Sequence, residues 1–375
     1  MSSKKMLKNN KKVLVAMSGG VDSSVAAYLL KKQGYEVIGA FMHSFNLDGC
    51  EQQDILDAQL VANQLKIPFY VFDFEKEYKK KVIDYILEEY QKGYTPNPDV
   101  MCNKEIKFGL FLEKAKQLKI PYIATGHYVK LKKKKYKNKF IYSLYQAKDL
   151  NKDQSYFLWT LNSKQLKHCL FPLGDYLKQE VRSIAQKIGL INALKKDSQG
   201  ICFLGKISLR DFLKKYLKTK RGLVVNLKGE KIGEHEGVWF YTIGQRHLKL
   251  LKYYPRKLGP QQLKPLYVVE KDIKNNILIV AEDENDKNLF KKEIIVTQLN
   301  FVNPLFKEKI NLKNKIKVFV RVRYRQNLNP AYLLKEKNKK YKILFLKPVK
   351  FVAPGQSAVF YSSLKELIGG GIIIN

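Results

Sequence analysis

The chain of 375 residues lacks any apolar segment near the roughly 18 residues that a membrane-spanning helix requires. The apolar run that follows its lysine-rich start, Val13 to Met17, is too short for the core of a signal peptide. These two absences argue against a membrane protein and against an exported one. We therefore expect a cytoplasmic protein.

Cysteine is also scarce, since the chain has only Cys50, Cys102, Cys169 and Cys202. No two of them form a CxxC pair, which argues against a structural zinc ribbon and a clustered iron–sulfur site. Four cysteines in a chain of this length are not a disulfide scaffold either, so a reducing compartment is expected. We predict no protein-held metal.

Acidic residues and arginine are few, whereas lysine is abundant. The 70 Lys and Arg against 34 Asp and Glu give a formal charge of +36, which favours a polyanionic partner. Solvated lysines or compositional drift are the alternative explanations. Three of the eight arginines, Arg321, Arg323 and Arg325, alternate in VFVRVRYRQ. On a strand they would share one face, either as a phosphate-binding row or as an exposed face that discourages edge pairing.

Strand and helix patterns alternate in the first half of the chain. A βαβα order predicts a parallel, doubly wound α/β sheet, whose ligands lie beyond the carboxyl ends of the strands. The predicted elements are strands at 12–17, 35–42, 69–74 and 122–125, and helices at 23–33, 51–66, 75–91, 103–118, 163–169 and 177–188.

The second half of the chain has a different pattern. Short predicted strands separated by Gly, Asn, Lys and Pro dominate it. A basic hairpin is expected at 131–144, a strand at 238–243, and only strands after about Lys291, including 318–325. The last region predicts a β-barrel or sandwich. The expected domains are 1–206, 207–288 and 289–375.

The strongest local signal is the loop AMSGGVDSS, from Ala16 to Ser24, between a predicted strand and a predicted helix. Glycines allow a phosphate to approach the backbone, and the helix N-terminus supplies N–H groups and a favourable dipole. A GxxxxGK[ST] motif is absent, so the loop is not of the kinase type. The loop instead resembles that of the ATP pyrophosphatases, and this resemblance implies that Asp22 would help to hold Mg²⁺ or brace the loop.

A second signal is TPNPDVMCN, from Thr95 to Asn103. Its two prolines are expected to exclude helix before Asn103, so that Asn97, Asp99 and Cys102 lie at the mouth of the next helix. A thiol at a helix N-terminus has a lowered pKa, and Asp99 is close enough in sequence to exchange a proton with it.

A third signal is DSQGICFL, which contains Cys202 on an expected loop. Its neighbours Ile201 and Phe203 are apolar, so the residues alone favour a buried small side chain over a catalytic thiol.

Several motifs carry a family resemblance. The loop SGGVDSS resembles that of the ATP pyrophosphatases, which cleave ATP between the α- and β-phosphates and adenylate a carbonyl oxygen. With TPNPDVMCNKEIKFG, TGHY, KDQSYFL, SQGICF, YTIGQRH, VRYRQ and PGQ in this order, nearly the whole chain resembles the tRNA-specific 2-thiouridylases. That family replaces the C2 oxygen of the wobble uridine with sulfur. It implies an ATP-pyrophosphatase domain, a small linking domain and a C-terminal antiparallel β-barrel.

The resemblance also implies roles for residues. Cys102 would be the nucleophile, Cys202 the persulfide carrier, and Asp99 a catalytic residue; the two cysteines would end as a disulfide. The implied ATP-site residues are Ala16, Met17, Ser18, Gly19, Gly20, Val21, Asp22, Ser23, Met42 and Gly126. The implied tRNA-site residues are Asn97, Pro98, Asp99, Lys152, Asp153, Gln154, Arg323 and Tyr324. Expected partners are ATP, Mg²⁺, the anticodon loop of tRNA and a sulfur-donor protein, with the chain itself a monomer.

Two alternatives compete with this interpretation. Another ATP pyrophosphatase, such as an amide-forming synthetase or a lysidine synthase, would share the phosphate loop without needing Cys102 and Cys202. A non-enzymatic RNA-binding protein with a degenerate nucleotide site would show no tRNA-dependent release of pyrophosphate.

Overall fold

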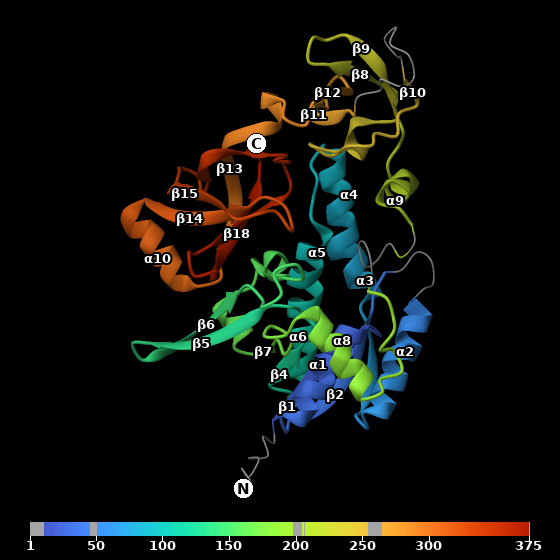
Figure 1. Ribbon diagram of the computed structural model, residues 1–375, viewed down its shortest axis with the longest axis vertical. Coiled ribbons are helices and arrows are strands. Elements are labelled where there is room, and N and C mark those ends of the chain that lie inside the picture. Colours follow the sequence, from blue (N-terminus) through green and yellow to red (C-terminus); the bar gives the residue numbers. More distant parts are fainter. Residues whose placement is uncertain (1–10, 46–50, 198–204, 206, 254–264, 375) are drawn as a thin grey trace.

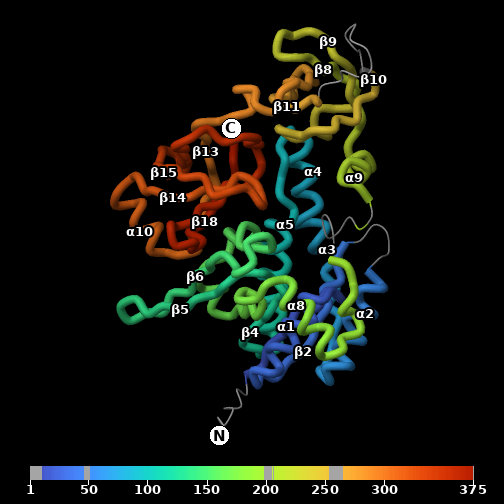
Figure 2. Tube along the Cα trace, viewed as in Figure 1, coloured from blue at the N-terminus to red at the C-terminus, as the bar shows by residue number. Residues whose placement is uncertain are grey.

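The computed structural model describes residues 11–45, 51–197, 205, 207–253 and 265–374 (Figure 1). A parallel sheet with helices comes first, a second sheet follows, and a closed barrel ends the chain. The trace shows the barrel beside α4 and α5, with the second sheet beyond the end of α4 (Figure 2). Among the described residues, no helix combines the length and apolar character that crossing a bilayer needs.

The parallel sheet has the strand order β3-β2-β1-β4-β7, and every neighbouring pair in it is parallel. This confirms the predicted doubly wound fold. The order changes direction between β1 and β4, and such a switch point opens a crevice at the carboxyl ends of the strands. The strands are β1 (Lys12–Ala16), β2 (Glu36–His43), β3 (Phe69–Asp73), β4 (Tyr122–Ala124) and β7 (Cys169–Leu170).

Alternating residues of β1 explain why helices cover both faces of the sheet. Val13 and Val15 are buried in a cluster with α1 (Val21–Lys32), α2 (Glu51–Gln64) and α8 (Lys178–Lys187). Leu14 and Ala16 are buried on the other face. The helical segments of that face are α3 (Glu75–Tyr78), η1 (Lys79–Ile83), α4 (Asp84–Gln91), α5 (Pro98–Met101), η2 (Cys102–Leu110) and α6 (Phe111–Gln117).

The expectation that two prolines exclude helix before Asn103 is wrong. Helical backbone starts at Pro98, because proline at the first helical position lacks only an N–H that has no partner there anyway. Asn97 caps this start by accepting a hydrogen bond from the Val100 N–H at 3.2 Å. Cys102 therefore lies in the second helical turn, away from the helix mouth.

The second sheet has the order β10-β9-β8-β12-β11. The strand expected at 238–243 is instead a 3-10 turn, η5 (Val238–Phe240), since a short buried apolar run does not distinguish the two. The expected hairpin is confirmed as β5 and β6. These regions contain β5 (Lys130–Tyr136), β6 (Lys139–Tyr145), η3 (Ser155–Leu158), α7 (Ser163–Leu166), α9 (Leu209–Tyr216), β8 (Gly222–Asn226), β9 (Lys231–His235), β10 (Lys252–Tyr253), β11 (Tyr267–Asp272) and β12 (Ile277–Ala281).

The C-terminal region is a closed barrel of order β13-β16-β15-β14-β17-β18, which decides between the predicted barrel and sandwich. The expectation of strands alone after Lys291 is wrong, because α10 (Pro304–Lys313) follows β13. Ile310 is the only residue of α10 that is buried, so the helix has no apolar stripe to reveal it. The other elements are η7 (Lys287–Leu289), β13 (Phe290–Phe301), β14 (Lys315–Arg321), β15 (Asn329–Lys335), β16 (Tyr341–Lys350), β17 (Ser357–Tyr361) and β18 (Leu367–Ile373).

Buried hydrogen bonds attach the barrel to the first domain. The Tyr156 hydroxyl donates to the Ser357 carbonyl at 2.9 Å, and the Trp159 indole donates to the Ser357 hydroxyl at 3.0 Å. Gly370 lies against the same indole, at a distance that would place an added Cβ 2.7 Å from the ring. The barrel is thus held in a fixed position against η3 and Trp159 of the first domain.

Candidate active site

The phosphate loop joins β1 to α1 at the crevice of the parallel sheet. Gly19 has a φ of +71°, and a Cβ there would lie 2.5 Å from the Asp54 carbonyl oxygen, so the position accepts only glycine. No side chain caps the first turn of α1, which leaves backbone N–H groups for an anion. The residues fit a bound phosphate group.

Side-chain hydroxyls hold this loop in shape. The Ser23 hydroxyl accepts from the Ser18 N–H at 3.1 Å and donates to the Gly20 carbonyl at 3.1 Å. Ser24 donates to the same carbonyl at 2.9 Å. Asn192, which the sequence analysis did not identify, donates to the Gly19 carbonyl at 2.9 Å. The loop is therefore preorganised by its own serines and by one residue of a distant segment.

Asp22 is engaged by two protein side chains. The Lys178 ammonium donates to its two oxygens at 2.7 and 2.8 Å, and the Tyr128 hydroxyl donates at 2.8 Å. Of the two predicted roles, these contacts favour bracing the loop over holding Mg²⁺. Lys178 was missed because it begins α8, 156 residues away in sequence.

A second carboxylate, Asp197, belongs to the same network. It accepts from Lys178 at 2.8 Å, from Lys152 at 2.7 Å and from Arg182 at 2.6 Å. Burial alone would raise the pKa of Asp197, but hydrogen bonds from Lys152 and Lys178 hold it well below its usual value. Cys202 lies five positions further along the chain and, like Cys50, is outside the described residues.

The other predicted ATP-site residues gather around this loop. Met42 is near the carboxyl end of β2, next to β1 in the sheet. Gly126 follows β4 and packs on α1 so closely that a Cβ would lie 2.8 Å from the Ser23 nitrogen. Ala16, Met17 and Val21 are buried at the join between β1 and α1. The structure thus brings the ten predicted residues to one edge of the sheet.

One group of described residues has the composition of a cation site. His43, Asp73 and Glu75 place ligand atoms within 4.8 Å of one another at the carboxyl ends of β2 and β3. His43 is already engaged, because its Nδ1 lies 2.7 Å from a Glu51 oxygen. No motif in the sequence indicates this group.

A cavity of about 310 Å³ lies where the three regions of the chain meet. Of the predicted tRNA-site residues, it is lined by Asn97, Pro98, Asp99 and Tyr324. The remaining lining residues were not predicted: Tyr90, Thr95, Pro96, Phe157, Leu209, Thr242 and Gln356. A volume of this order suits a planar base with a few polar contacts.

Aromatic and amide side chains give this cavity its chemistry. The rings of Phe157 and Tyr324 have centroids 4.5 Å apart and form one aromatic wall. Gln356 donates to the Thr95 carbonyl at 2.9 Å, which ties the barrel to the TPNPD segment. Phe157 and Gln356 lie in KDQSYFL and PGQ, so the motifs contained them without indicating their role.

Asp99 and Cys102 lie three positions apart on continuous helix, a spacing that places side chains on one face. Burial raises the pKa of the Asp99 carboxyl, and the positive charge of Lys107 opposes that shift. Cys102 is 8% exposed, in a cluster with Val100 and Ile106. The pair is a shielded thiol beside a carboxyl of raised proton affinity.

The predicted row of arginines on one strand is wrong. Strand β14 ends at Arg321, and Arg325 has a φ of +63°, so the three do not share a strand face. Arg321 is buried and donates to Asp153 at 3.0 Å. Arg323 donates to the Ile243 carbonyl. Only Arg325 is exposed.

The KDQ residues do not form one surface. The Asp153 carboxylate is 1% exposed and accepts from Arg321, Gln146 and the Ala147 N–H, so it holds the interior together. Gln154 accepts from the Tyr128 N–H at 3.0 Å. Lys152 is bound to Asp197. A direct tRNA contact by the Asp153 carboxylate does not fit this burial.

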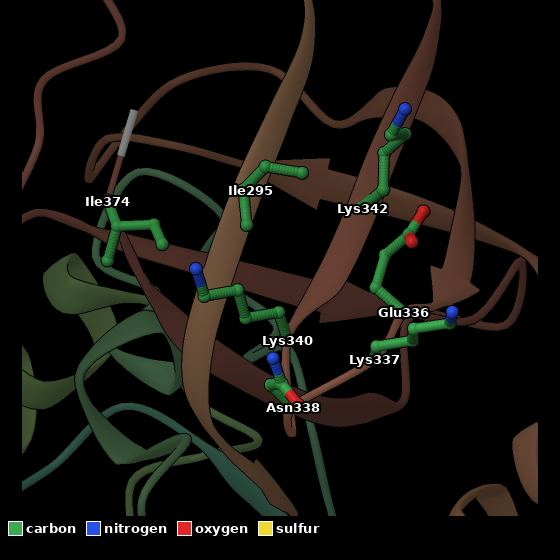
Figure 3. Close-up of a pocket in the computed structure, with 7 residues that line it drawn as sticks. All are labelled: Ile295, Glu336, Lys337, Asn338, Lys340, Lys342 and Ile374. Atoms are coloured by element: carbon green, nitrogen blue, oxygen red, sulfur yellow. The ribbon is translucent and has the colours of Figure 1, made fainter.

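A larger cavity of about 430 Å³ lies on the barrel and contains none of the predicted site residues. Figure 3 shows Lys337, Lys340 and Lys342 around it, with Ile295 and Ile374 at one side. Its lining contains one carboxylate, that of Glu336, and no aromatic ring. The cavity beside Asp99 is the better candidate for chemistry.

Comparison with known proteins agrees with this geometry. Family models match residues 11–206 ("tRNA methyl transferase HUP domain"), 210–282 ("tRNA methyl transferase PRC-barrel domain") and 291–373 ("Aminomethyltransferase beta-barrel domain"). The chain is similar to proteins named tRNA-specific 2-thiouridylase MnmA. The one from Karelsulcia muelleri is 47% identical over 97% of this chain and 98% of the relative. The relative from Photorhabdus laumondii is 46% identical over 97% of this chain and 97% of the relative. The relative from Salmonella typhimurium is 44% identical over 98% of each chain. The chain belongs to the tRNA-specific 2-thiouridylase family.

Proposed function

We propose that the chain is an ATP-dependent tRNA 2-thiouridylase that replaces the C2 oxygen of the wobble uridine with sulfur. The observation that carries this proposal is the cavity beside Asp99, where residues of three regions converge on one aromatic-walled site. Cys102, a buried thiol, follows Asp99 by three positions on the same helical stretch. The family membership and the preorganised phosphate loop support it.

The phosphate loop would hold the leaving pyrophosphate. When ATP is bound, the uracil C2 oxygen attacks the α-phosphorus, pyrophosphate departs, and the oxygen becomes part of a good leaving group. The N–H groups at the start of α1 would stabilise the charge that develops on the phosphates. Because Lys178 and Tyr128 already bind Asp22, we propose that Mg²⁺ enters with ATP instead of being held by Asp22 alone.

The cavity would receive a base splayed out of the anticodon loop, which is single-stranded and gives up little stacking. Phe157 and Tyr324 offer an aromatic wall for stacking, and Asn97 and Asp99 offer polar groups to the edge of the base. The position of Asn97, Pro98, Asp99 and Tyr324 in the lining of the cavity supports the proposed contact with the base.

Sulfur would arrive as a persulfide on Cys202. In one route its outer sulfur attacks C2, AMP leaves with the former C2 oxygen, and the Cys102 thiolate then attacks the Cys202 sulfur. A Cys102–Cys202 disulfide forms, and the electron pair of the broken S–S bond stays on the thiouridine sulfur. In the other route Cys102 attacks first and releases hydrosulfide, which attacks C2. In both, Asp99 accepts the Cys102 proton, and an external thiol reductant restores the cysteines.

The reaction requires partners that the chain does not contain. A donor protein, either a sulfur relay or a cysteine desulfurase, would load Cys202. We propose that the enzyme acts in the cytoplasm as a monomer, where tRNA, ATP and thiol reductants are available.

Mass analysis of nucleosides tests the proposal. Unmodified tRNA incubated with protein, ATP, Mg²⁺ and a persulfide donor should yield a uridine with one oxygen replaced by sulfur. Cys202→Ser and Cys102→Ser should each abolish the product, whereas Cys169→Ser, which changes a buried thiol of β7 that belongs to none of the motifs, should retain it. Pyrophosphate release without sulfur uptake would favour another ATP pyrophosphatase.

A further inference from the structure

The hairpin of β5 and β6 is a cationic ribbon that the proposed chemistry does not use. Its two strands pair only with each other in the sheet topology, from Lys130 opposite Tyr145 to Tyr136 opposite Lys139. Residues 132–140 are all exposed. Six of these nine residues are lysines and none is acidic: Lys132, Lys133, Lys134, Lys135, Lys137 and Lys139.

Ion pairing neutralises little of the charge of the ribbon, although the Glu366 carboxylate at its base acts on Lys134. Lys130 at its base pairs with Asp175 at 2.9 Å. In the described part of the chain, none of the six lysines forms an ion pair with a carboxylate. Most of them lie over aromatic rings instead: Lys133 is 3.9 Å from the Phe140 centroid, and Lys132 is 4.6 Å from that of Tyr145. Such contacts orient the ammonium groups while leaving their charge available.

The base of the ribbon is rigidly attached to the barrel. The Tyr145 hydroxyl donates to Glu366 at 3.0 Å, and Asn303 donates to the same carboxylate at 2.6 Å. Tyr145 also forms an isolated antiparallel bridge with Glu366. Because the ribbon is fixed at its base, its exposed outer half presents the lysine charges at a defined position. Lysines scattered on a solvated surface have no such fixed arrangement.

The ribbon points away from the cavity beside Asp99, where the base is proposed to bind. Figure 1 shows the β5–β6 turn extending away from α5, the helix that contributes Pro98 and Asp99 to the cavity. No hairpin residue lines the cavity. A polyanion bound at both places must therefore extend well beyond the anticodon loop.

We propose that the β5–β6 hairpin binds the sugar–phosphate backbone of the tRNA body, outside the anticodon stem-loop. The proposal rests on the proposed function for the identity of the RNA. Lysine contacts to phosphate position a nucleic acid without reading its sequence, so the hairpin would set affinity and register for many tRNAs.

A charge-matched pair of variants tests the proposal. The hairpin variant carries Lys133→Gln, Lys135→Gln, Lys137→Gln and Lys139→Gln. The control carries Lys32→Gln, Lys66→Gln, Lys116→Gln and Lys187→Gln, all exposed. These control residues lie at or just after the C-terminal ends of helices that pack on the parallel sheet, on the edge opposite the phosphate loop. A third variant with four Lys→Arg changes in the hairpin keeps the charge.

Dissociation constants are measured for a full-length tRNA transcript and for an anticodon stem-loop over a range of salt concentrations. The hairpin variant should bind full-length tRNA at least about tenfold more weakly, with a salt slope smaller by about 3, but bind the stem-loop as wild type does. The control and the Lys→Arg variant should stay within about twofold of wild type.

Equal losses in the hairpin and control variants would overturn the proposal, because bulk charge would then explain the binding. An equal loss of stem-loop binding would overturn it as well, since the ribbon would then lie at the anticodon. These binding results do not depend on turnover. A wild-type protein that binds tRNA through the hairpin but never thiolates it would contradict the proposed function and leave this inference standing.

Discussion

Asp99 shows how the surroundings of one side chain set its chemistry. Burial raises the pKa of its carboxyl, and Lys107 limits the rise. A carboxylate with a raised pKa is a stronger base, and helical spacing places it on the same face as Cys102. His127 behaves in the opposite sense: burial holds the pKa of its imidazole well below the usual value, with Lys107 acting in the same direction. His127 is therefore neutral near pH 7.

The pH dependence of thiolation should report Asp99. The base is active when deprotonated, so kcat/KM should fall as the pH falls through the raised pKa of Asp99, at a higher pH than for an ordinary aspartate. Lys107→Gln removes a positive charge, raises this pKa further, and should move the acid limb to still higher pH. Lys116→Gln, an exposed change on the same helical stretch, should leave the profile in place. An unchanged profile in Lys107→Gln would contradict this role.

Lys178 should control the ATP loop. It is 8% exposed and is the cation that Asp22 and Asp197 share. Lys178→Met should weaken ATP binding about tenfold, which corresponds to about 1.4 kcal/mol. Lys148→Met removes an exposed ion pair with Glu180, a residue of the helix that also contains Lys178. This change should alter ATP affinity by less than about 0.5 kcal/mol. Calorimetric titration of ATP measures both, and equal effects would argue against a specific brace.

At the scale of elements, apolar periodicity located the parallel sheet, and the order of strands and helices predicted its topology. Buried runs such as Lys12–Ala16 leave little choice of structure. Two predictions were wrong because contacts of single residues determine the structure there. Pro98 starts a helix because Asn97 caps it. The helix α10 was not predicted because only one of its residues is buried. The alternation of Arg321, Arg323 and Arg325 indicated a strand, yet the chain turns after Arg321 to bury one guanidinium against Asp153.

The end of β14 gives a stability test of that correction. Arg321→Gln leaves Asp153 as a buried carboxylate without its cation and should lower the free energy of unfolding by about 3 kcal/mol. Arg325→Gln changes an exposed residue of the same segment and should cost less than about 0.5 kcal/mol. Urea unfolding of both variants measures the difference. Similar midpoints would restore the interpretation of the arginines as an equivalent surface row.

At the scale of the whole molecule, the site depends on contacts between regions far apart in sequence. Asn97 and Asp99 were predictable from a motif, but the motif says nothing of Thr242 or Gln356, which reach the same cavity from the second sheet and the barrel. Lys178 and Asn192 likewise come to the phosphate loop through tertiary packing. Sequence patterns located the reacting groups, whereas the supporting residues follow only from the assembled fold.

Gly355 provides a test of this assembly. Its φ is +90°, and a Cβ there would lie 2.7 Å from the Thr95 nitrogen. Here the barrel contacts the TPNPD segment, which lines the cavity beside Asp99. Gly355→Ala should cost about 1–3 kcal/mol at this contact and raise KM for tRNA, while ATP binding to the distant loop stays unchanged. Gly189→Ala is a control with a similar backbone strain (φ +65°) but no neighbour within 4 Å. An equal KM for tRNA in both variants would show that this contact of the barrel does not shape the cavity beside Asp99.

The central claim is that the ATP loop and the cysteines act on the same carbon of one uridine. The most direct measurement is a single turnover of tRNA that carries a heavy-oxygen label at C2 of the wobble uridine, with a persulfide donor and unlabelled ATP. We predict that thiouridine and AMP form in equal amounts and that the heavy oxygen is recovered in the AMP. Thiouridine formed with unlabelled AMP would contradict adenylation of C2 and, with it, the coupling of the two sites.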